Sequence, residues 1–341
     1  MGSSATRILS TPQGVVFLTA LAFALVLGFL NPAFLSPATV IDLLRNSLVT
    51  AIFALGVMMV LASGGIDVSC TAIGAFAMYA SVKIVIGLGL HLPIAVYFAL
   101  AAVIGAGLGL VNGILVGALG LSTLIVTLGT MSLFRGALLT FLGTVYITAV
   151  PREVISFARS TLVRMENALG QMVSLPMSFF VLVGVGAFVA FVMNFTMFGR
   201  KIYAIGGSEE AASRIGIRVG RVKVLIYVLA GAIAGLAGMT HMTLSRMANP
   251  FDLVGMELNV IAAVVLGGAR ITGGHGTVLG TLLGAFVITM INTTLLMAGV
   301  PSYWQNVVIG CLIVAGTGLP ILIERLGRRR ARMRLALGKQ G

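Results

Sequence analysis

The chain has 341 residues, of which 59% are hydrophobic and only 9% are charged, and its formal net charge is +13 at pH 7. A soluble domain has about a quarter of its residues charged, which gives it a polar surface. This composition therefore excludes a soluble globule and predicts a polytopic membrane protein. Thirteen of the 22 basic residues lie in two segments, at 199–223 and 325–339. Basic segments beside apolar runs are typical of loops that flank membrane spans and contact anionic lipid, so no nucleic-acid partner is expected.

Apolar runs of about 20 residues mark membrane-spanning helices, and shorter ones mark broken or re-entrant segments. The sequence predicts ten such segments, at about 15–30, 48–63, 70–87, 92–116, 122–147, 177–197, 222–243, 257–270, 276–298 and 303–323. Glycine-rich breaks separate the second from the third segment at 64–67, and the eighth from the ninth at 267–274. No small-residue cleavage site follows the first apolar run, so we expect it to remain as a span. The predicted fold is all-α, with one transmembrane domain over residues 1–341.

Ten spans place both termini on the same side of the membrane. If that side is the cytoplasm, it receives 15 basic residues and the opposite side six, while Arg135 lies within a span. This ratio obeys the positive-inside rule and predicts a multi-pass protein with both termini cytoplasmic. The segment 199–223 and the basic tail 324–341 are then cytoplasmic, and 148–176 is a long external loop.

The 44 glycines are patterned along several spans. Small residues four apart let helix backbones approach closely in lipid, where no hydrophobic drive brings helices together. We therefore expect tight helix packing at two groups of glycines, which are Gly105, Gly109, Gly113 and Gly117 in the fourth span and Gly276, Gly280 and Gly284 in the ninth. A faint internal repeat also relates 64–69 to 273–277, and glycine-interrupted repeats in transporters often mark the transport pathway.

The charged segment 199–223 predicts a short helix between two spans. Ser208 can cap it, Glu209 and Glu210 occupy its first turn, Arg214 follows Glu210 by four residues, and Gly216 can end it. Ala211 and Ala212 give it a small apolar face. Such a helix is either a solvated topological loop or a docking helix for a cytoplasmic partner.

Several polar residues inside the spans are candidates for the pathway or a gate, namely Asp67, Asn112, Arg135 and Asn292. Asp67, at a cytoplasmic break, fits a helix cap better than a gate, because Asp satisfies free amides at helix starts. Asn112 and Asn292 suit hydrogen bonds between helices. Arg135, toward the outer half of its span, can extend to the membrane surface instead of touching solute. His241 has no acidic residue close in sequence and is expected to be structural.

No residues have the spacing of a catalytic site or a metal-ligand cluster, and Cys70 and Cys311 form no CxxC motif. Nothing matches the P-loop pattern GxxxxGK[ST], so the chain itself is not expected to cradle ATP phosphates or to need a cofactor. Catalysis by this chain is therefore not expected, and any ATP energy would have to come from another polypeptide.

Four stretches together resemble one family. Glu210-Ala211-Ala212, followed by Gly216, is similar to the EAA loop of permeases of ATP-binding cassette (ABC) importers, and the wider run 203–212 resembles the ribose-type branch. Agreement extends over three further stretches, which are 61–69 (LASGGIDVS), 128–136 (LGTMSLFRG) and 261–281 (IAAVVLGGARITGGHGTVLGT). The resemblance covers about residues 15–323.

The resemblance implies that two permease subunits, identical or not, pair in the membrane. Each would rest its 208–216 helix in a groove on a cytoplasmic ABC ATPase, and a periplasmic binding protein would deliver sugar to the outer face. The implied function is import of a monosaccharide or similar small polyol by alternating access. Two alternatives remain open, namely a permease for another small solute such as branched-chain amino acids, and a secondary transporter driven by ions. The second would require membrane-embedded carboxylates, for which only Asp67 and Glu257 qualify.

Overall fold

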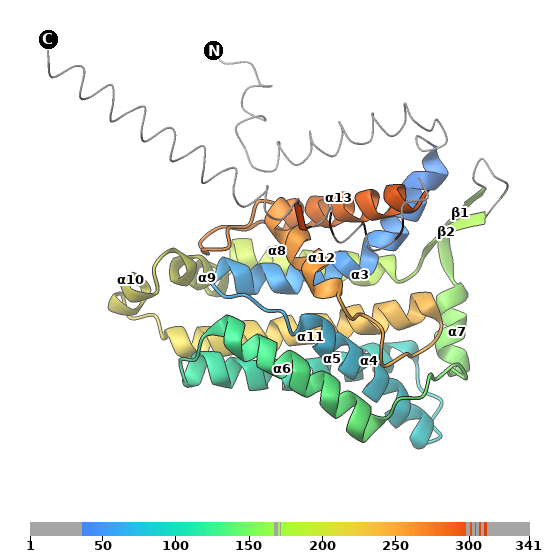
Figure 1. The fold of residues 1–341 in the computed structure, drawn as a ribbon, viewed down its shortest axis with the longest axis horizontal. Coiled ribbons are helices and arrows are strands. Elements are labelled where there is room, and N and C mark those ends of the chain that lie inside the picture. The colour runs from blue at the N-terminus through green and yellow to red at the C-terminus, as the bar shows by residue number, and fades with distance from the viewer. Residues whose placement is uncertain are drawn as a thin grey trace, which may run out of the picture.

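The computed structural model describes residues 36–166, 170, 172–297, 301, 304, 307, 310 and 311. It is a bundle of helices that run between an end marked by α10 and an end marked by α7 (Figure 1). The helices are α3 (Pro37–Ala62), α4 (Cys70–Gly87), α5 (Ile94–Gly113), α6 (Thr123–Ala137), α7 (Arg152–Arg159), α8 (Phe179–Phe195), α9 (Met197–Gly207), α10 (Glu209–Arg214), α11 (Val219–Ser245), α12 (Met256–Leu266) and α13 (Val278–Met297). Two π-helical turns, Ile114–Ala118 after α5 and Leu138–Leu142 after α6, and two short strands, β1 (Thr161–Glu166) and β2 (Met172–Pro176), complete the described elements.

Six of the described helices are long and apolar enough to cross a membrane, and the bent pair α8 and α9 would make a seventh span. The all-α polytopic prediction is therefore confirmed. The predicted spans at 15–30 and 303–323, and the basic tail 324–341, lie wholly or largely outside the described residues. Each of the other eight predicted segments contains a helix in the structure. The bounds of α4 are those predicted, 70–87.

Three predicted segments differ in extent from the structure. The segment predicted at 48–63 is part of α3, which already begins at Pro37, because Ser36 caps the helix although its first turns are too polar for the hydropathy criterion. The segment predicted at 257–270 is the 11-residue α12, too short to cross a membrane alone, because Gly267 and Gly268 end the helix. The segment predicted at 122–147 is helical only to Leu142, where its last turn is π-helical and ends at Gly143 with φ +121°. Hydropathy did not predict where α12 and the segment ending at Leu142 stop, because the residues that follow them are themselves apolar or small.

The bend between α8 and α9 measures 72°. Thr196 has extended backbone between the two helices, and its hydroxyl accepts a hydrogen bond from the Gly199 amide at 3.2 Å, which caps the start of α9. The first half of the predicted loop 199–223 is therefore a helix that turns across the end of the bundle.

Glycines bring α5 and α11 into backbone contact. A Cβ at Gly105 would overlap the carbonyl of Gly231, and one at Gly109 would overlap the carbonyl of Tyr227. A Cβ at Gly113 would lie 2.8 Å from the Val224 carbonyl oxygen. No side chain with a Cβ fits at these positions without separating the two helices.

A similar contact joins α12 to α13. Gly280 lies against the carbonyl of Gly267, and Gly284 lies against the carbonyl of Ala263. Gly276 differs from these two, because a Cβ there would meet side chains and not backbone, namely Met58 at 3.3 Å and the Cβ of Ala269 at 3.5 Å.

The long loop predicted at 148–176 contains α7 and an antiparallel hairpin. Strands β1 and β2 pair Val163 with Leu175 and Glu166 with Met172, with an irregularity between Thr161 and Val163. These strands are an addition to the predicted all-α fold and lie at the α7 end of the bundle, outside the helical core (Figure 1).

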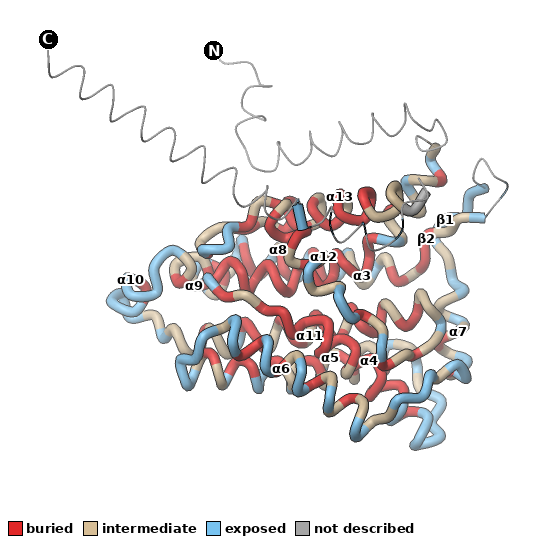
Figure 2. The backbone as a smooth tube through the Cα atoms, viewed as in Figure 1, coloured by how far each residue is buried: buried red, intermediate tan, exposed pale blue. Residues whose placement is uncertain are grey.

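The break at 64–67 and the loop 246–255 between α11 and α12 both run into the bundle. Residues 63–69 leave the end of α3 and pass inward to the start of α4, and Asp67 and Ser69 in this stretch are 1% and 0% exposed. The loop after α11 likewise returns inward before α12 begins (Figure 1). Figure 2 shows that burial is continuous through α3, α4 and α11 around these stretches. Both short helices α4 and α12 therefore start inside the fold.

Candidate functional site

Helix α10 is a six-residue helix at one extreme of the bundle, and it has the predicted cap. The Ser208 hydroxyl accepts a hydrogen bond from the Ala211 amide at 3.2 Å. Gly216, just past the C-terminus of the helix, has φ +85°, a conformation that glycine adopts without strain. Ala212 is buried, whereas Glu209, Glu210 and Arg214 are exposed. The helix therefore exposes its charged side chains and buries one small apolar residue, Ala212, against the bundle.

Two ion pairs fix the charges of α10. Arg214 bonds Glu210 at 2.6 Å, and both side chains are more than three-quarters exposed, so this i,i+4 pair adds only about 0.3–0.5 kcal/mol. Lys223, on α11, bonds Glu209 at 2.7 Å, and its side chain is 16% exposed. The second pair ties α10 to a long helix of the bundle.

The end of α9 touches both breaks. A Cβ at Gly206 would overlap the carbonyl of Ala62 and the amide of Gly274. The two breaks also touch each other, since a Cβ at Gly273 would lie 2.8 Å from the Cα of Gly64, and the Gly274 amide donates to the Ala62 carbonyl at 3.0 Å. The faint sequence repeat around 64 and 273 thus corresponds to two loops in contact. Through Gly206, α9 connects α10 to both of them.

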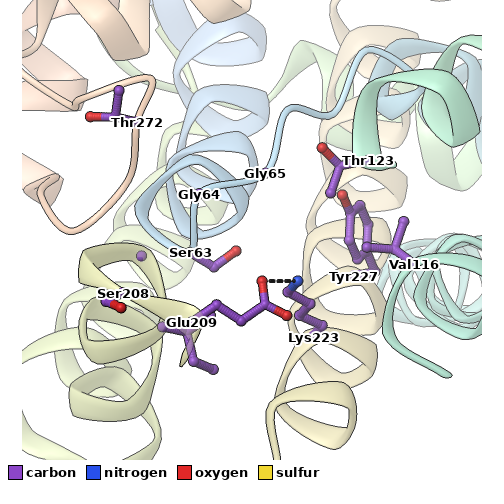
Figure 3. A pocket seen from close by; sticks show the side chains of 12 residues that line it. Ser63, Gly64, Gly65, Val116, Thr123, Ser208, Glu209, Lys223, Tyr227 and Thr272 are labelled. Carbon is purple, nitrogen blue, oxygen red and sulfur yellow. Dashed lines mark hydrogen bonds and ion pairs between the residues drawn. The ribbon is translucent and has the colours of Figure 1, made fainter. Parts of the chain in front are cut away.

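A cavity of about 230 Å³ lies beside this contact. Residues of the first break, α9, α10 and α11 line it together with Thr123 and Thr272, and the Glu209–Lys223 pair closes one side (Figure 3). The Tyr227 hydroxyl at the cavity is buried and makes no hydrogen bond to any described residue. The cavity therefore lies between the first break, α10 and α11.

Asp67 and Asn112 belong to one buried chain of hydrogen bonds. The Asp67 carboxylate accepts from the amide of Ser69 at 2.8 Å and from its hydroxyl at 2.6 Å. The Asn112 amide on α5 donates to the same hydroxyl at 2.8 Å. Asp67 thus accepts hydrogen bonds just before α4, in the manner of a cap, and it is buried inside the bundle. Asn112 links α5 to this cap.

Arg135 does not extend toward the membrane surface. Its guanidinium donates to Glu257 at the start of α12, at 3.3 Å, and to the Thr71 hydroxyl at the start of α4, at 3.2 Å. Thr71 in turn donates to Glu257 at 3.0 Å. Sequence reasoning could not find this cluster, because its three members are far apart in the chain and follow no motif.

Two other predicted polar residues lie elsewhere. His241 is 2.8 Å from a carboxylate oxygen of Asp252, a partner eleven residues on, in the loop after α11. The Asn292 side-chain oxygen on α13 is buried and makes no hydrogen bond to any described residue. Neither residue contacts the Arg135 cluster or α10. Cys70 is buried and Cys311 exposed, and no group of three metal-ligating side chains occurs in the part of the chain that the structure describes.

An apolar helical bundle, two helices that begin inside it and a charged helix at one end define a class. These are the features of a polytopic membrane protein whose interior is interrupted by helix breaks.

Comparisons with known proteins specify the family. Residues 39–316 match the family described as "Branched-chain amino acid transport system / permease component", and the chain belongs to this family. It is 37% identical to the ribose import permease protein RbsC of Bacillus subtilis, over 91% of each chain. It is 34% identical to the autoinducer 2 import system permease protein LsrC of an Enterobacter species, over 94% of this chain and 89% of the relative. It is 33% identical to the galactose/methyl galactoside import permease protein MglC of Escherichia coli, over 91% and 94%. No solved structure matches the chain.

Proposed function

We propose that this chain is the membrane permease of an ABC importer for a monosaccharide or similar small polyol. The observation that carries the proposal is its similarity, over about nine-tenths of its length, to import permeases named for ribose, galactose and autoinducer 2. The proposed assembly contains two permease subunits, two cytoplasmic ATPases and a periplasmic binding protein. It lies in a bacterial inner membrane, with the α10 end and both termini facing the cytoplasm.

The ATPase is proposed to act on α10. The chain has no P-loop of its own, and the exposed charges of α10 stand at the extreme of the bundle. When the ATPases close, they displace α10. The displacement passes to α9 and then to Ala62 and Gly274, because the backbone of Gly206 is in direct contact with both. The two breaks then shift, and the passage between the subunits changes from outward-facing to inward-facing.

The two alternatives have less support. The family description mentions branched-chain amino acids, but the relatives cited above are named for ribose, galactose and autoinducer 2. An ion-driven transporter needs carboxylates that titrate on the pathway. Within the described residues, Asp67 is engaged by Ser69 and Glu257 is engaged by Arg135, so each carboxylate already has a structural partner.

The test is uptake by the reconstituted importer. The permease, its ATPase and its binding protein are placed in liposomes, and uptake of labelled D-ribose, D-galactose and L-leucine is measured. We expect uptake of at least one sugar that requires ATP and the binding protein and that persists with an uncoupler. Uptake of leucine alone would replace the sugar assignment, and uptake that an uncoupler abolishes without ATP dependence would contradict the importer class.

A further inference from the structure

A cluster of charge lies deep in the bundle, where two helices begin. The pair Arg135–Glu257 has side chains that are 24% and 15% exposed, and Thr71 between them is fully buried. The Glu257 carboxylate oxygen that accepts from both also accepts from the Gly255 amide at 3.1 Å. Since Glu257 and Thr71 are each the second residue of their helix, the positive ends of α12 and α4 face this carboxylate together.

The depth of the cluster follows from helix geometry. Glu257 precedes Leu266, the α10-side end of α12, by nine residues, which is about 14 Å at 1.5 Å per residue. Arg135 follows Thr123, which lines the α10-side cavity, by twelve residues, or about 18 Å. A hydrocarbon core is about 30 Å thick, so both estimates place the cluster near its middle.

The cluster is not sealed. The Arg135 and Glu257 side chains keep 24% and 15% of their surface exposed, so part of the ion pair can be reached from outside the packed core. Charges at mid-membrane are costly against lipid and normally face the interior or a water-filled cavity. A face that carries a part-exposed ion pair at this depth therefore borders the passage and not the lipid.

Hydrogen-bonding capacity remains unused at this face. The second oxygen of Glu257, and the Nε and Nη1 atoms of Arg135, make no hydrogen bond with any residue that the structure describes. The charges of Arg135 and Glu257 neutralise each other. The pair therefore presents adjacent hydrogen-bond donors and an acceptor to a solute, without a net charge. This combination fits neighbouring hydroxyl groups of a neutral solute, whereas a zwitterion would have to part the pair.

We propose that Arg135 and Glu257, held in place by the buried Thr71, form a solute-contacting site halfway along the passage, which binds the hydroxyl groups of a neutral polyol at the junction of α4, α6 and α12. This inference rests on the proposed function and names the place where the permease itself touches its cargo. The short helices that start there connect the site to both breaks, so movement of the breaks would open or close it.

The first test compares sugar uptake by variants of the reconstituted importer. The double variant Arg135→Gln and Glu257→Gln removes both charges together, so that neither is left unpaired, and Arg135→Lys keeps the charge but loses the planar fork. We expect at least tenfold slower uptake in the double variant, and in Arg135→Lys a changed ratio of D-ribose to D-galactose uptake. The control Ser132→Ala, one turn earlier on α6, should transport normally, and every variant should copurify with the ATPase.

Uptake by the double variant within twofold of wild type would overturn the proposal. An unchanged sugar ratio in Arg135→Lys, with both rates lowered in proportion, would also overturn it, because a purely structural ion pair affects all solutes equally.

The second test does not depend on which solute is carried. In a background with Cys70→Ala and Cys311→Ala, Glu257→Cys and Arg135→Cys are each exposed to a charged, water-soluble methanethiosulfonate in the assembled importer. The matched control is Val103→Cys, at mid-length of α5 and 68% exposed on an apolar face. We expect at least tenfold faster modification at 257 and 135 than at 103, and rates no faster than the control would overturn the site even if sugar uptake is intact. If sugar uptake is absent in the wild type while fast modification is observed, the proposed function fails and the site stands.

Discussion

At the scale of single residues, glycine sets how closely the helices pack. Gly107 and Gly109 lie on the same helix, but only Gly109 contacts α11, through the carbonyl of Tyr227. Nothing lies within 4 Å of a Cβ added at Gly107. The spacing of four at 105, 109 and 113 was enough to predict the contact face, because a helix repeats every 3.6 residues. The same spacing was a poorer guide at Gly276, where backbone contact was expected but the glycine faces side chains.

Gly109→Ala should lower stability, whereas Gly107→Ala should not. The added methyl group at 109 forces two backbones apart, at a cost of about 1–3 kcal/mol, while at 107 replacing glycine in a helix is neutral or favourable. Thermal unfolding of the purified permeases in detergent measures the difference. Equal unfolding temperatures for the two variants would contradict the backbone contact.

At the scale of elements, the sequence showed where helices exist better than where they end. The cap, first turn and terminal glycine of α10 are local features, so Ser208, Glu209 and Gly216 could be assigned roles from the chain alone. The inward course of 63–69 and the short length of α12 depend on packing against other helices. The Arg135–Glu257 pair is a contact of the same kind, across 122 positions.

Reversing the charges of α10 should release the ATPase. Glu209→Lys with Glu210→Lys breaks both ion pairs and changes the sign of the exposed surface, while the buried Ala212 and the membrane spans are untouched. We expect loss of ATPase copurification with unchanged permease abundance in membranes. Glu153→Lys, on α7 at the opposite end, is the matched control and should copurify normally, and retention of the ATPase by the α10 variant would disprove the coupling role.

At the scale of the whole molecule, both ends of the bundle carry basic residues, and they differ in the elements that form them. The α10 end carries Arg200, Lys201, Arg218 and Arg221, which line one basic cavity, and the α7 end carries the hairpin. Counting charges predicted the sides of the membrane, but it could not predict the hairpin, because short strands with exposed residues leave no strong alternation in so apolar a chain.

Labelling of single cysteines tests this orientation. In the background without native cysteines, Ser156→Cys on α7 and Ser213→Cys on α10 are both exposed positions. An impermeant thiol reagent should label 156 in intact cells, and 213 only after the membrane is permeabilised. The reverse pattern would invert the proposed topology and remove α10 from reach of a cytoplasmic ATPase.

The contact between α5 and α11 also bears on how the protein is made. More than 100 residues separate the end of α5 at Gly113 from the start of α11 at Val219. At a synthesis rate of 5–20 residues per second, α5 waits in the membrane for about 5–20 s before its partner leaves the ribosome. During that interval its glycine face has only lipid or a chaperone to cover it. A chain truncated before α11 is thus left with an unsatisfied helix surface, by which a membrane protease can distinguish unfinished permeases from complete ones.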